Sequence, residues 1–225
     1  MMKGYYKKKL SAERLQTCYE IAPPRVKEYL ESEIDFVLER TAISQTVLEL
    51  GCGYGRVLKR VAAGAGRSFG IDTSLESLRF ARDFLSGPET VRLLLMDASR
   101  MGFSDRRFDL TFCVQNGISA FAVDRPKLFG EALRVTRPGG TVLFSTYAPR
   151  FWNDRLEWFE RQSAHGLLGE VDREATRDGV IVCKDGFRAT TVEIEEFQDL
   201  AARHGVIPRI VEVDGSSLFC EVTAS

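Results

Sequence analysis

The chain has 225 residues, of which 44% are hydrophobic and 28% are charged, and its formal net charge at pH 7 is −1. Such a length and composition are typical of one globular domain with a sizeable core. The near-zero net charge supplies no basic field to attract nucleic acid, and we expect no DNA partner. The short basic run Lys7–Lys9 is more typical of a solvated surface than of a binding patch. No apolar stretch is long enough to span a membrane, and no signal peptide is expected at the start.

Five cysteines are scattered along the chain, and no pair has the spacing of metal ligands. We therefore expect no metal site, and free buried thiols in a reducing compartment, which predicts a cytoplasmic protein. A thiol set for arsenic or another soft acceptor is the alternative, although no local pattern favours it. The cysteines are Cys18, Cys52, Cys113, Cys183 and Cys220.

Residues 1–22 have no clear pattern, although Tyr5, Tyr6 and Tyr19 are conspicuous aromatic residues. Pro23-Pro24 then predicts the start of a helix, because proline suits the first helical turn. Apolar residues recur at helical spacing from there to Leu38.

Residues 47–56 are the stretch around which the chain is organised, with glycines at every second position at Gly51, Gly53 and Gly55. Apolar residues before them predict a buried strand, and Val57–Ala63 have helical spacing. Glycine is needed where the backbone adopts positive φ or a ligand presses on the main chain. The helix N-terminus that follows favours a ligand carboxylate or phosphate.

The glycine spacing differs from the Gly-x-Gly-x-x-Gly of dinucleotide sites. With Glu49 two residues before the first glycine, Glu-x-Gly-x-Gly-x-Gly closely resembles the cofactor motif of class I S-adenosylmethionine (AdoMet) methyltransferases of the small-molecule type. The resemblance implies that the turn, Cys52 included, contacts the methionine end of AdoMet, with Glu49 near its ammonium. Another nucleotide, or a plain α/β turn with spare glycines, is the alternative.

A short second strand, 68–71, ends at Asp72, which lies 21 residues after Gly51. A carboxylate at this position can accept hydrogen bonds from both ribose hydroxyls, because it has two acceptor oxygens. Thr73-Ser74-Leu75-Glu76 predicts a capping box that begins a helix running to about Leu85. Asp72 could itself cap this helix, but the box assigns that role to Thr73, which we also expect beside the cofactor.

A third strand is predicted at 91–96, where an apolar run is interrupted only by Arg92. Such a run is typical of a central parallel strand. It ends at Asp97-Ala98, and the resemblance implies that Asp97 accepts a hydrogen bond from the adenine amine. The backbone N–H of Ala98 would then donate to the adenine ring.

The fourth strand, 108–114, is followed by Gln115-Asn116-Gly117. Ligands of open parallel sheets bind beyond the carboxyl ends of the strands, so Gln115 is expected at the cofactor and Asn116 at the acceptor. An Asn-Gly pair can also be only a turn. The Asn/Asp-Pro-Pro-Tyr/Phe signature of methyltransferases acting on base amino groups is absent, which argues against a DNA acceptor.

Asp124 and Pro126 predict the start of a helix that runs to Val135. Arg137-Pro138-Gly139-Gly140 breaks it, and Thr141–Tyr147 predicts the fifth strand. A helix, Arg-Pro-Gly-Gly and a strand in this order again resemble the class I methyltransferases.

Residues 148–176 interleave aromatic and charged side chains, which predicts an amphipathic helix. The resemblance implies that residues 1–40 form a helical cap and that an insertion at 148–190 roofs the acceptor pocket. Candidates for that pocket are Tyr19, Asn116, Tyr147 and Trp152, with His165 as a weak candidate for a catalytic base. The alternative is that these aromatic residues only pack a helix on the sheet.

The last part of the chain predicts a hairpin around Asp185-Gly186, a helix from Thr191 to Gly205, and a closing hairpin at 206–222. A terminal antiparallel pair is the expected end of the class I fold. We therefore predict one α/β domain with a Rossmann-like, doubly wound, seven-stranded sheet. The sheet is mostly parallel with an antiparallel last strand, and helices cover both faces.

These features predict an AdoMet-dependent methyltransferase that acts on a small-molecule acceptor. The alternatives are a non-catalytic AdoMet-binding module and a methyltransferase acting on RNA or protein. An NAD-dependent oxidoreductase is disfavoured by the glycine spacing. The sequence gives no oligomeric state and no identity for the acceptor.

Overall fold

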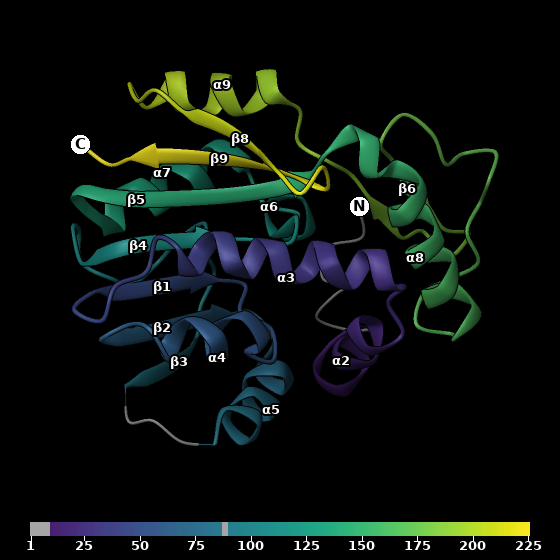
Figure 1. Cartoon of the computed structure of the whole chain (residues 1–225), viewed down its shortest axis with the longest axis horizontal. Coiled ribbons are helices and arrows are strands. Elements are labelled where there is room, and N and C mark those ends of the chain that lie inside the picture. The colour runs from purple at the N-terminus through teal and green to yellow at the C-terminus, as the bar shows by residue number, and fades with distance from the viewer. Residues whose placement is uncertain (1–9, 87–89) are drawn as a thin grey trace.

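A computed structural model describes residues 10–86 and 90–225. The predictions for Tyr5, Tyr6 and Lys7–Lys9 fall outside the described residues. Seven strands form one sheet in the order β3-β2-β1-β4-β5-β9-β8 (Figure 1). The strands are β1 (Thr46–Leu50), β2 (Arg67–Asp72), β3 (Val91–Leu95), β4 (Phe108–Cys113), β5 (Thr136–Tyr147), β8 (Arg209–Val213) and β9 (Ser217–Thr223).

Pairing is parallel from β3 through to β5, and β9 runs antiparallel to both of its neighbours. This confirms the predicted Rossmann-like sheet with an antiparallel last strand. A separate two-stranded hairpin, β6 (Ile181–Val182) and β7 (Arg188–Ala189), forms at the predicted Asp-Gly turn.

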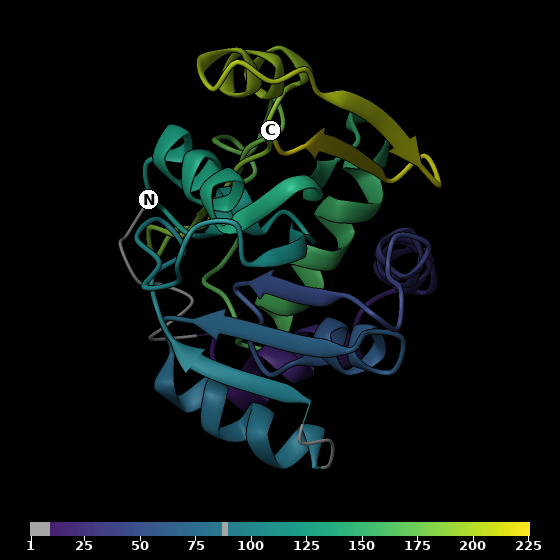
Figure 2. The same cartoon turned by 90° about the vertical axis from the view of Figure 1, so that its left-hand side faces the viewer.

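Helices cover both faces of the sheet (Figures 1 and 2). One face packs against α3 (Pro24–Leu38) and α4 (Arg56–Ala62), and α4 packs in turn against α5 (Leu75–Leu85). The other face packs against α7 (Arg125–Val135) and α9 (Ile194–Arg203). The remaining helical segments are α2 (Ala12–Glu20), α6 (Gly117–Ala120), η1 (Pro149–Phe151) and α8 (Trp152–Ala164).

Strand β4 shows why the sheet needs both layers. Leu110 and Phe112 belong to the cluster under α3 and α4, whereas Phe108 and Cys113 belong to the cluster under α7 and α9. All four side chains are fully buried. A strand with apolar residues on both faces is stable only when each face is covered, which is the rule for parallel sheets.

The prediction for the third strand is wrong in one respect, because β3 is an edge strand and not a central one. Leu95 is 57% exposed, and the other residues of β3 are at most half-buried. The apolar run is explained by packing on both faces, since Val91 and Leu93 contact the cluster formed by α4 and α5, and Leu94 contacts the cluster under α7 and α9.

Helices α2 and α8 lie beyond the carboxyl ends of the parallel strands (Figure 1). The predicted helix after Pro23-Pro24 is confirmed as α3, and α8 confirms the amphipathic helix after the fifth strand. All five cysteines are free and buried, as predicted. Within the described ranges, no helix has both the length and the apolarity needed to cross a bilayer.

Candidate functional site

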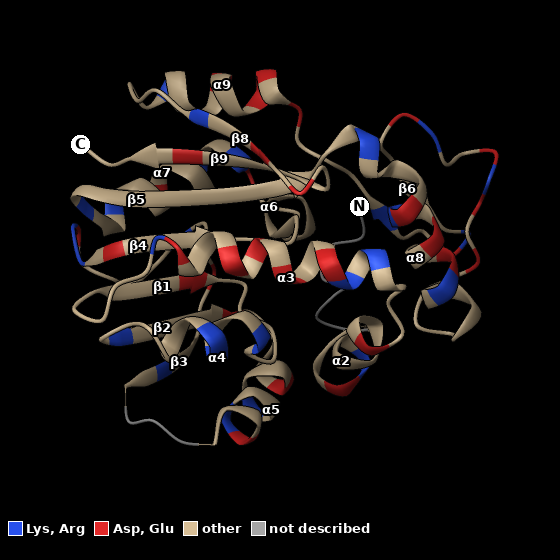
Figure 3. Cartoon of the chain, in the orientation of Figure 1, with Lys and Arg blue, Asp and Glu red and all other residues tan. Residues whose placement is uncertain are grey.

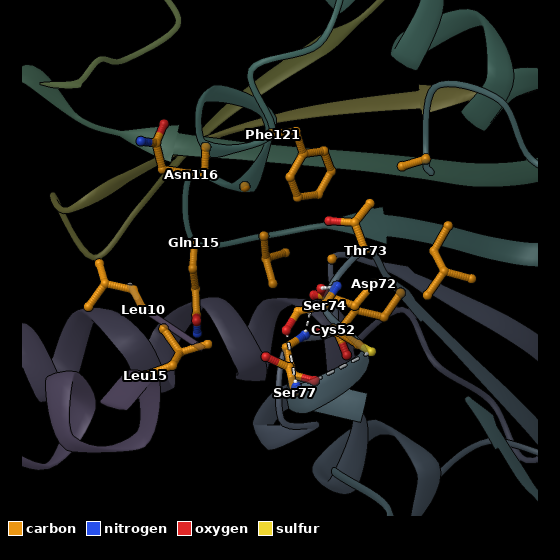
Figure 4. A pocket seen from close by; sticks show the side chains of 18 of the residues that line it. Leu10, Leu15, Cys52, Asp72, Thr73, Ser74, Ser77, Gln115, Asn116 and Phe121 are labelled. Atoms are coloured by element: carbon orange, nitrogen blue, oxygen red, sulfur yellow. Dashed lines mark hydrogen bonds between the residues drawn. The ribbon is translucent and has the colours of Figure 1, made fainter. Parts of the chain in front are cut away.

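A cavity of about 720 Å³ lies at the carboxyl ends of the parallel strands. Its volume falls within the range of small-molecule sites, roughly 300–1,000 Å³. The glycine turn after β1, the ends of β2, β3 and β4, and helices α2 and α8 all contribute to its wall. Figure 4 shows labelled side chains from α2, the glycine turn and the segments after β2 and β4 around one space.

The glycine turn forms the floor of the cavity. Gly51 and Gly53 have positive φ angles of 71° and 53°, and both line the cavity. A Cβ atom at Gly51 would lie 2.4 Å from the ring of Phe121, and one at Gly53 would lie 3.0 Å from Leu15. Gly55 does not line the cavity, because it begins α4 with φ at 88° and faces Leu85. Two glycines therefore keep the floor open, and the third starts the helix.

Glu49 and Arg56 place a carboxyl group and a guanidinium beside this floor. The Oε2 atom of Glu49 is buried and has no hydrogen-bond partner among the described residues, and the same holds for Nε and Nη2 of Arg56. Both residues line the cavity. Burial raises the pKa of Glu49 to about 8; Arg56 opposes this rise, and Asp72 adds to it. The remaining nitrogen of Arg56 is 3.5 Å from the carboxylate of Glu31.

Asp72 ties the end of β2 to the glycine turn while it faces the cavity (Figure 4). Its carboxylate accepts hydrogen bonds from the backbone N–H of Gly53 at 3.0 Å and of Ser74 at 2.7 Å. Each carboxylate oxygen can accept a second hydrogen bond. The predicted capping box is wrong by one residue, because Ser74 and not Thr73 is the N-cap of α5, accepting from the N–H of Ser77. Thr73 lines the cavity instead.

Asp97 and Ala98 follow the neighbouring strand β3 and also line the cavity. The Oδ1 atom of Asp97 accepts hydrogen bonds from the N–H and the hydroxyl of Ser99, each at 2.8 Å. These bonds fix the carboxylate, and the structure describes no bond to its other oxygen. Because β2 and β3 are adjacent and parallel, the structure brings Asp72 and Asp97 to the same end of the sheet.

Gln115 and Asn116 come after β4 and both have φ at 58°, which is rare for residues other than glycine. Asn116 is committed to the protein, since its amide donates to the carbonyl of Thr190 and its oxygen accepts from the hydroxyl of Thr146. Gln115 instead points across the cavity toward Leu15 (Figure 4). Its Nε2 atom is buried without a described partner.

Two of the aromatic candidates line the cavity. Tyr19 contributes from α2, where its ring lies 6.1 Å from that of Trp158 and 4.5 Å from the guanidinium of Arg56. Tyr147 contributes from the end of β5. Cys52, in the glycine turn, lines the cavity as well.

The structure does not bring Trp152 or His165 to this cavity. Trp152 lines a smaller cavity of about 420 Å³ next to it. His165 is exposed at the far end of α8, where its Nδ1 atom is 2.8 Å from the carbonyl oxygen of Arg161. The residues of α8 that line the cavity are Trp158, Phe159 and Gln162, whereas Trp152 begins the helix and His165 follows its last residue. The suggestion of His165 as a catalytic base is therefore withdrawn.

Sequence reasoning missed several residues that line the cavity. The signal for Arg56 was its place directly after the third glycine, at the start of a helix. Trp158 and Gln162 lie one helical turn apart, so they share a face of α8, but nothing in the sequence indicated which face is turned inward. The missed residues also include Leu10, Leu15, Ser77, Met96, Phe121 and Phe159.

Comparison with known proteins bears on this geometry. The sequence profile of a methyltransferase domain matches residues 47–140, which contain the glycine turn, both aspartates and the Arg-Pro-Gly-Gly segment. The arsenite methyltransferase of Aquipseudomonas alcaligenes is 30% identical over 180 residues, covering 74% of this chain and 45% of that protein. The chain belongs to the class I AdoMet-dependent methyltransferase family.

Further similarities agree with this assignment. The malonyl-[acyl-carrier protein] O-methyltransferase of Pectobacterium atrosepticum is 34% identical over 103 residues, covering 45% of this chain and 38% of that protein. The chain thus spans less than half the length of the curated relatives it matches. The crystal structure of the PH0226 protein from Pyrococcus horikoshii OT3 has the same fold, with a TM-score of 0.68, 20% identity and full coverage of both chains.

AdoMet is the cofactor of this chain, and the residues that line the cavity have groups suited to bind it. The amino-acid end of AdoMet carries one ammonium and one carboxylate. Glu49 and Arg56 offer an unpartnered buried carboxylate oxygen and unpartnered guanidinium nitrogens in the same cavity. Unpartnered buried polar atoms are costly, so their presence is explained by a ligand that satisfies them.

Proposed function

We propose that this chain transfers a methyl group from AdoMet to a small-molecule acceptor. The observation that carries the proposal is the pair of unpartnered buried groups, Glu49 and Arg56, in one cavity with Asp72 and Asp97. Beyond these groups the cavity continues under α2 and α8, and this part would receive the acceptor.

Each group would have a separate task. Glu49 would hold the ammonium of AdoMet, and Arg56 would hold its carboxylate by charge-assisted hydrogen bonds. Asp72 would accept from the ribose hydroxyls, and Asp97 with the N–H of Ala98 would bind the adenine edge. The resemblance to the family suggested the roles of Glu49, Asp72, Asp97 and Ala98, and the positions of these residues around one cavity support them.

AdoMet supplies an electrophilic methyl group on a sulfonium, so the protein's task is positioning. The acceptor's lone pair forms the new bond to the methyl carbon, the sulfur–methyl bond breaks with its electron pair left on sulfur, and the acceptor's proton passes to water. Alignment of two reactants in this way can lower a barrier by roughly 7–11 kcal/mol in favourable cases. Gln115, which points into the cavity from the end of β4, is placed to help orient the reactants.

Isothermal titration calorimetry tests the cofactor, with AdoMet, S-adenosylhomocysteine and NAD as ligands. We expect the first two to bind and NAD not to bind. Asp72→Ala should weaken both adenosyl ligands by about tenfold or more, because a buried ribose hydroxyl would lose a charged partner. Exposed Asp83 provides the control variant Asp83→Ala, which should bind like the unmodified chain. Binding of NAD alone would refute the proposal.

A second measurement separates catalysis from binding. The chain, with [methyl-³H]AdoMet, is offered a panel of small phenols, alcohols and amines, together with bulk RNA and a protein mixture. We expect label only in small molecules. Figure 3 supports this expectation, since acidic and basic residues are interspersed along the helices without a continuous basic stripe in this view. AdoMet binding without transfer to any class would instead favour a non-catalytic binding module.

A further inference from the structure

At one end of the cavity, the described residues that form the wall have uncharged side chains. This region, called the acceptor end below, is enclosed by α2, the end of β5 and α8. It is lined by Leu15, Cys18, Tyr19, Trp158, Phe159 and Gln162, with Tyr147 behind them. Three of the six are aromatic and two are otherwise apolar, so the surface is suited to a ring.

The charged residues of the cavity lie on other elements. Asp72 and Asp97 follow β2 and β3, and Glu49 and Arg56 flank the glycine turn. Asp124 and Lys127 line it from the start of α7. Of these, Arg56 also reaches the acceptor end, since its guanidinium lies 4.5 Å from the ring of Tyr19.

The titratable groups of the acceptor end are uncharged near neutral pH. Burial raises the pKa of Cys18 and that of Tyr147 each to about 12. Burial also raises the pKa of Tyr19 above its usual range, although Arg56 opposes the rise. Two guanidinium groups lie near this end, those of Arg56 and Arg155. Arg56 is assigned to the carboxylate of AdoMet. Arg155 packs behind the ring of Tyr147, where it donates to the carbonyls of Gly179 and Ala189. With AdoMet bound, an ion entering this space would therefore lose its water without a counter-ion among the described residues that line it, which is strongly unfavourable.

Gln162 is the polar exception. It lies in the last turn of α8, is only 4% exposed and lines the cavity. No hydrogen bond to its carboxamide is described, whereas the neighbouring indole N–H of Trp158 is already used by the carbonyl of Cys18 at 2.8 Å. A carboxamide in the cavity wall can hydrogen-bond to the polar group of a ligand, which gives specificity.

We propose that the methyl acceptor is an uncharged molecule with an aromatic or similarly flat apolar ring, and that Gln162 hydrogen-bonds to its polar group. This inference rests on the proposed function and narrows its substrate class. An acceptor with a free carboxylate, a phosphate or a permanent cation is thereby disfavoured. The reaction that supplies such an acceptor would be one that leaves a neutral hydroxyl or amine on a ring.

The test uses the full chain saturated with S-adenosylhomocysteine, so that the cofactor part is filled and no turnover occurs. Three probes of similar shape are titrated by calorimetry: 2-naphthol, 2-naphthoate and 2-naphthylmethylammonium. We expect 2-naphthol to bind at least tenfold more tightly than either ion. Equal or tighter binding of an ion, or no binding of 2-naphthol, overturns the inference while the proposed function stands. Failure of S-adenosylhomocysteine to bind overturns both.

Variants of Gln162 test its assignment. Gln162→Leu and Gln162→Met keep the approximate volume and remove the carboxamide, and each should weaken 2-naphthol by about three- to tenfold. Affinity for S-adenosylhomocysteine should not change, which separates loss of a contact from loss of folding. Gln198→Leu, on the exposed side of α9, is the matched control. Unchanged 2-naphthol affinity in both Gln162 variants would remove Gln162 from the acceptor site.

Discussion

Glu49 shows how burial changes the chemistry of one carboxyl group. Its pKa is raised to about 8, first because burial removes water, with Asp72 adding to the rise and Arg56 opposing it. At pH 7 the unliganded protein therefore holds this group mainly protonated. An ammonium bound against it favours the carboxylate, because opposite charges at short range lower the pKa of an acid.

We predict that AdoMet binding at pH 7 releases a proton from Glu49. Calorimetry in buffers of different ionisation enthalpy measures this release, which should approach one proton for each AdoMet bound. Glu49→Gln should abolish the release and weaken binding. Glu39→Gln, at a mostly exposed position on the C-terminal side of α3, should leave both unchanged. An undiminished release in Glu49→Gln would mean that another group loses the proton.

Glu33 is a second buried carboxyl group, and it fastens α3 to the sheet. Its carboxylate accepts hydrogen bonds from the N–H of Gln115 at 2.5 Å and from the hydroxyls of Ser145 and Ser217 at 2.8 and 2.6 Å. These donors follow β4 or belong to β5 and β9. Glu33 thus holds the left-handed backbone of Gln115 in place, and with it the direction of the Gln115 side chain.

Titration of Glu33 should make the free energy of unfolding depend on pH. Burial raises its pKa from 4.5 to about 7, although its three hydrogen-bond donors oppose the rise. Between these two values the unfolded chain releases the proton and the folded chain keeps it, so the contribution to stability falls as pH rises and is constant above pH 7. Over this range, the contribution of Glu33 to the free energy of unfolding falls by about 3 kcal/mol.

Glu33→Gln removes this titration. At pH 5 the variant should be less stable than the unmodified chain, because an amide NH₂ faces donors that need an acceptor. The difference should shrink by about 3 kcal/mol between pH 5 and pH 8. Urea unfolding at several pH values measures it. A difference that stays constant across this range would contradict the assignment of the titration to Glu33.

At the scale of elements, α2 closes one side of the cavity through contacts with two other helices. The backbone N–H of Ala12 donates to the hydroxyl of Ser77 in α5 at 3.2 Å. The indole of Trp158 in α8 donates to the carbonyl of Cys18. Arg14 donates to the carbonyl of Gly166, just after α8, at 2.8 Å. The wall of the acceptor end therefore depends on α2 remaining docked.

Trp158→Phe should loosen α2 without emptying its packing site, since it removes the indole N–H and keeps an aromatic ring. We predict that the backbone amides of residues 12–20 exchange faster in this variant than in the unmodified chain. S-adenosylhomocysteine should slow this exchange again in part, because the docked helix would enclose the ligand. Trp152→Phe is the control, because Trp152 lines the neighbouring cavity. Equal exchange of residues 12–20 in both variants would show that the indole bond does not hold α2.

Local patterns predicted most elements, and tertiary packing decided the rest. The glycine turn, the Asp124 cap of α7 and the Asp-Gly hairpin depend on neighbouring residues, and the structure confirms them. The edge position of β3 depends on strand order, which an apolar run does not encode. The cap of α5 shifted to Ser74 because Asp72 already accepts from the N–H of Ser74 and fixes the turn before the helix.

The same distinction applies to the residues of the candidate site: sequence patterns predicted some of them, and tertiary packing placed the others. Gln115 was predicted to face the site because ligands of parallel sheets bind beyond the carboxyl ends of the strands. Asp72 was predicted from its spacing and carboxylate chemistry, and Asp97 from the family resemblance, and all three residues line the cavity. Gln162 was missed, and His165 was misplaced, because the orientation of α8 is set by long-range packing. Trp158 and Phe159 face inward where α8 packs over Cys18 and Tyr147.

At the scale of the whole molecule, strand order explains where the cavity lies. The chain leaves β1 toward β2 and β3 on one side, and β4 and β5 lie on the other side. Ligand sites of open parallel sheets form at such a reversal, since the loops after the two central strands diverge there. The loop after β1 is the glycine turn, and the loop after β4 carries Gln115.

Because the cavity wall draws on the sheet, α2 and α8, a bound cofactor should stabilise the molecule as a unit. At a ligand concentration of 100 times its dissociation constant, the gain is about 2.7 kcal/mol. For a domain of this size that gain corresponds to a rise in Tm of roughly 5–10 °C. Thermal unfolding with S-adenosylhomocysteine should show this rise as one shifted transition. Asp72→Ala should lose most of it at the same ligand concentration, and Asp83→Ala should keep it. Two separate transitions, of which only one responds to the ligand, would show that α2 and α8 do not enclose the cofactor together with the sheet.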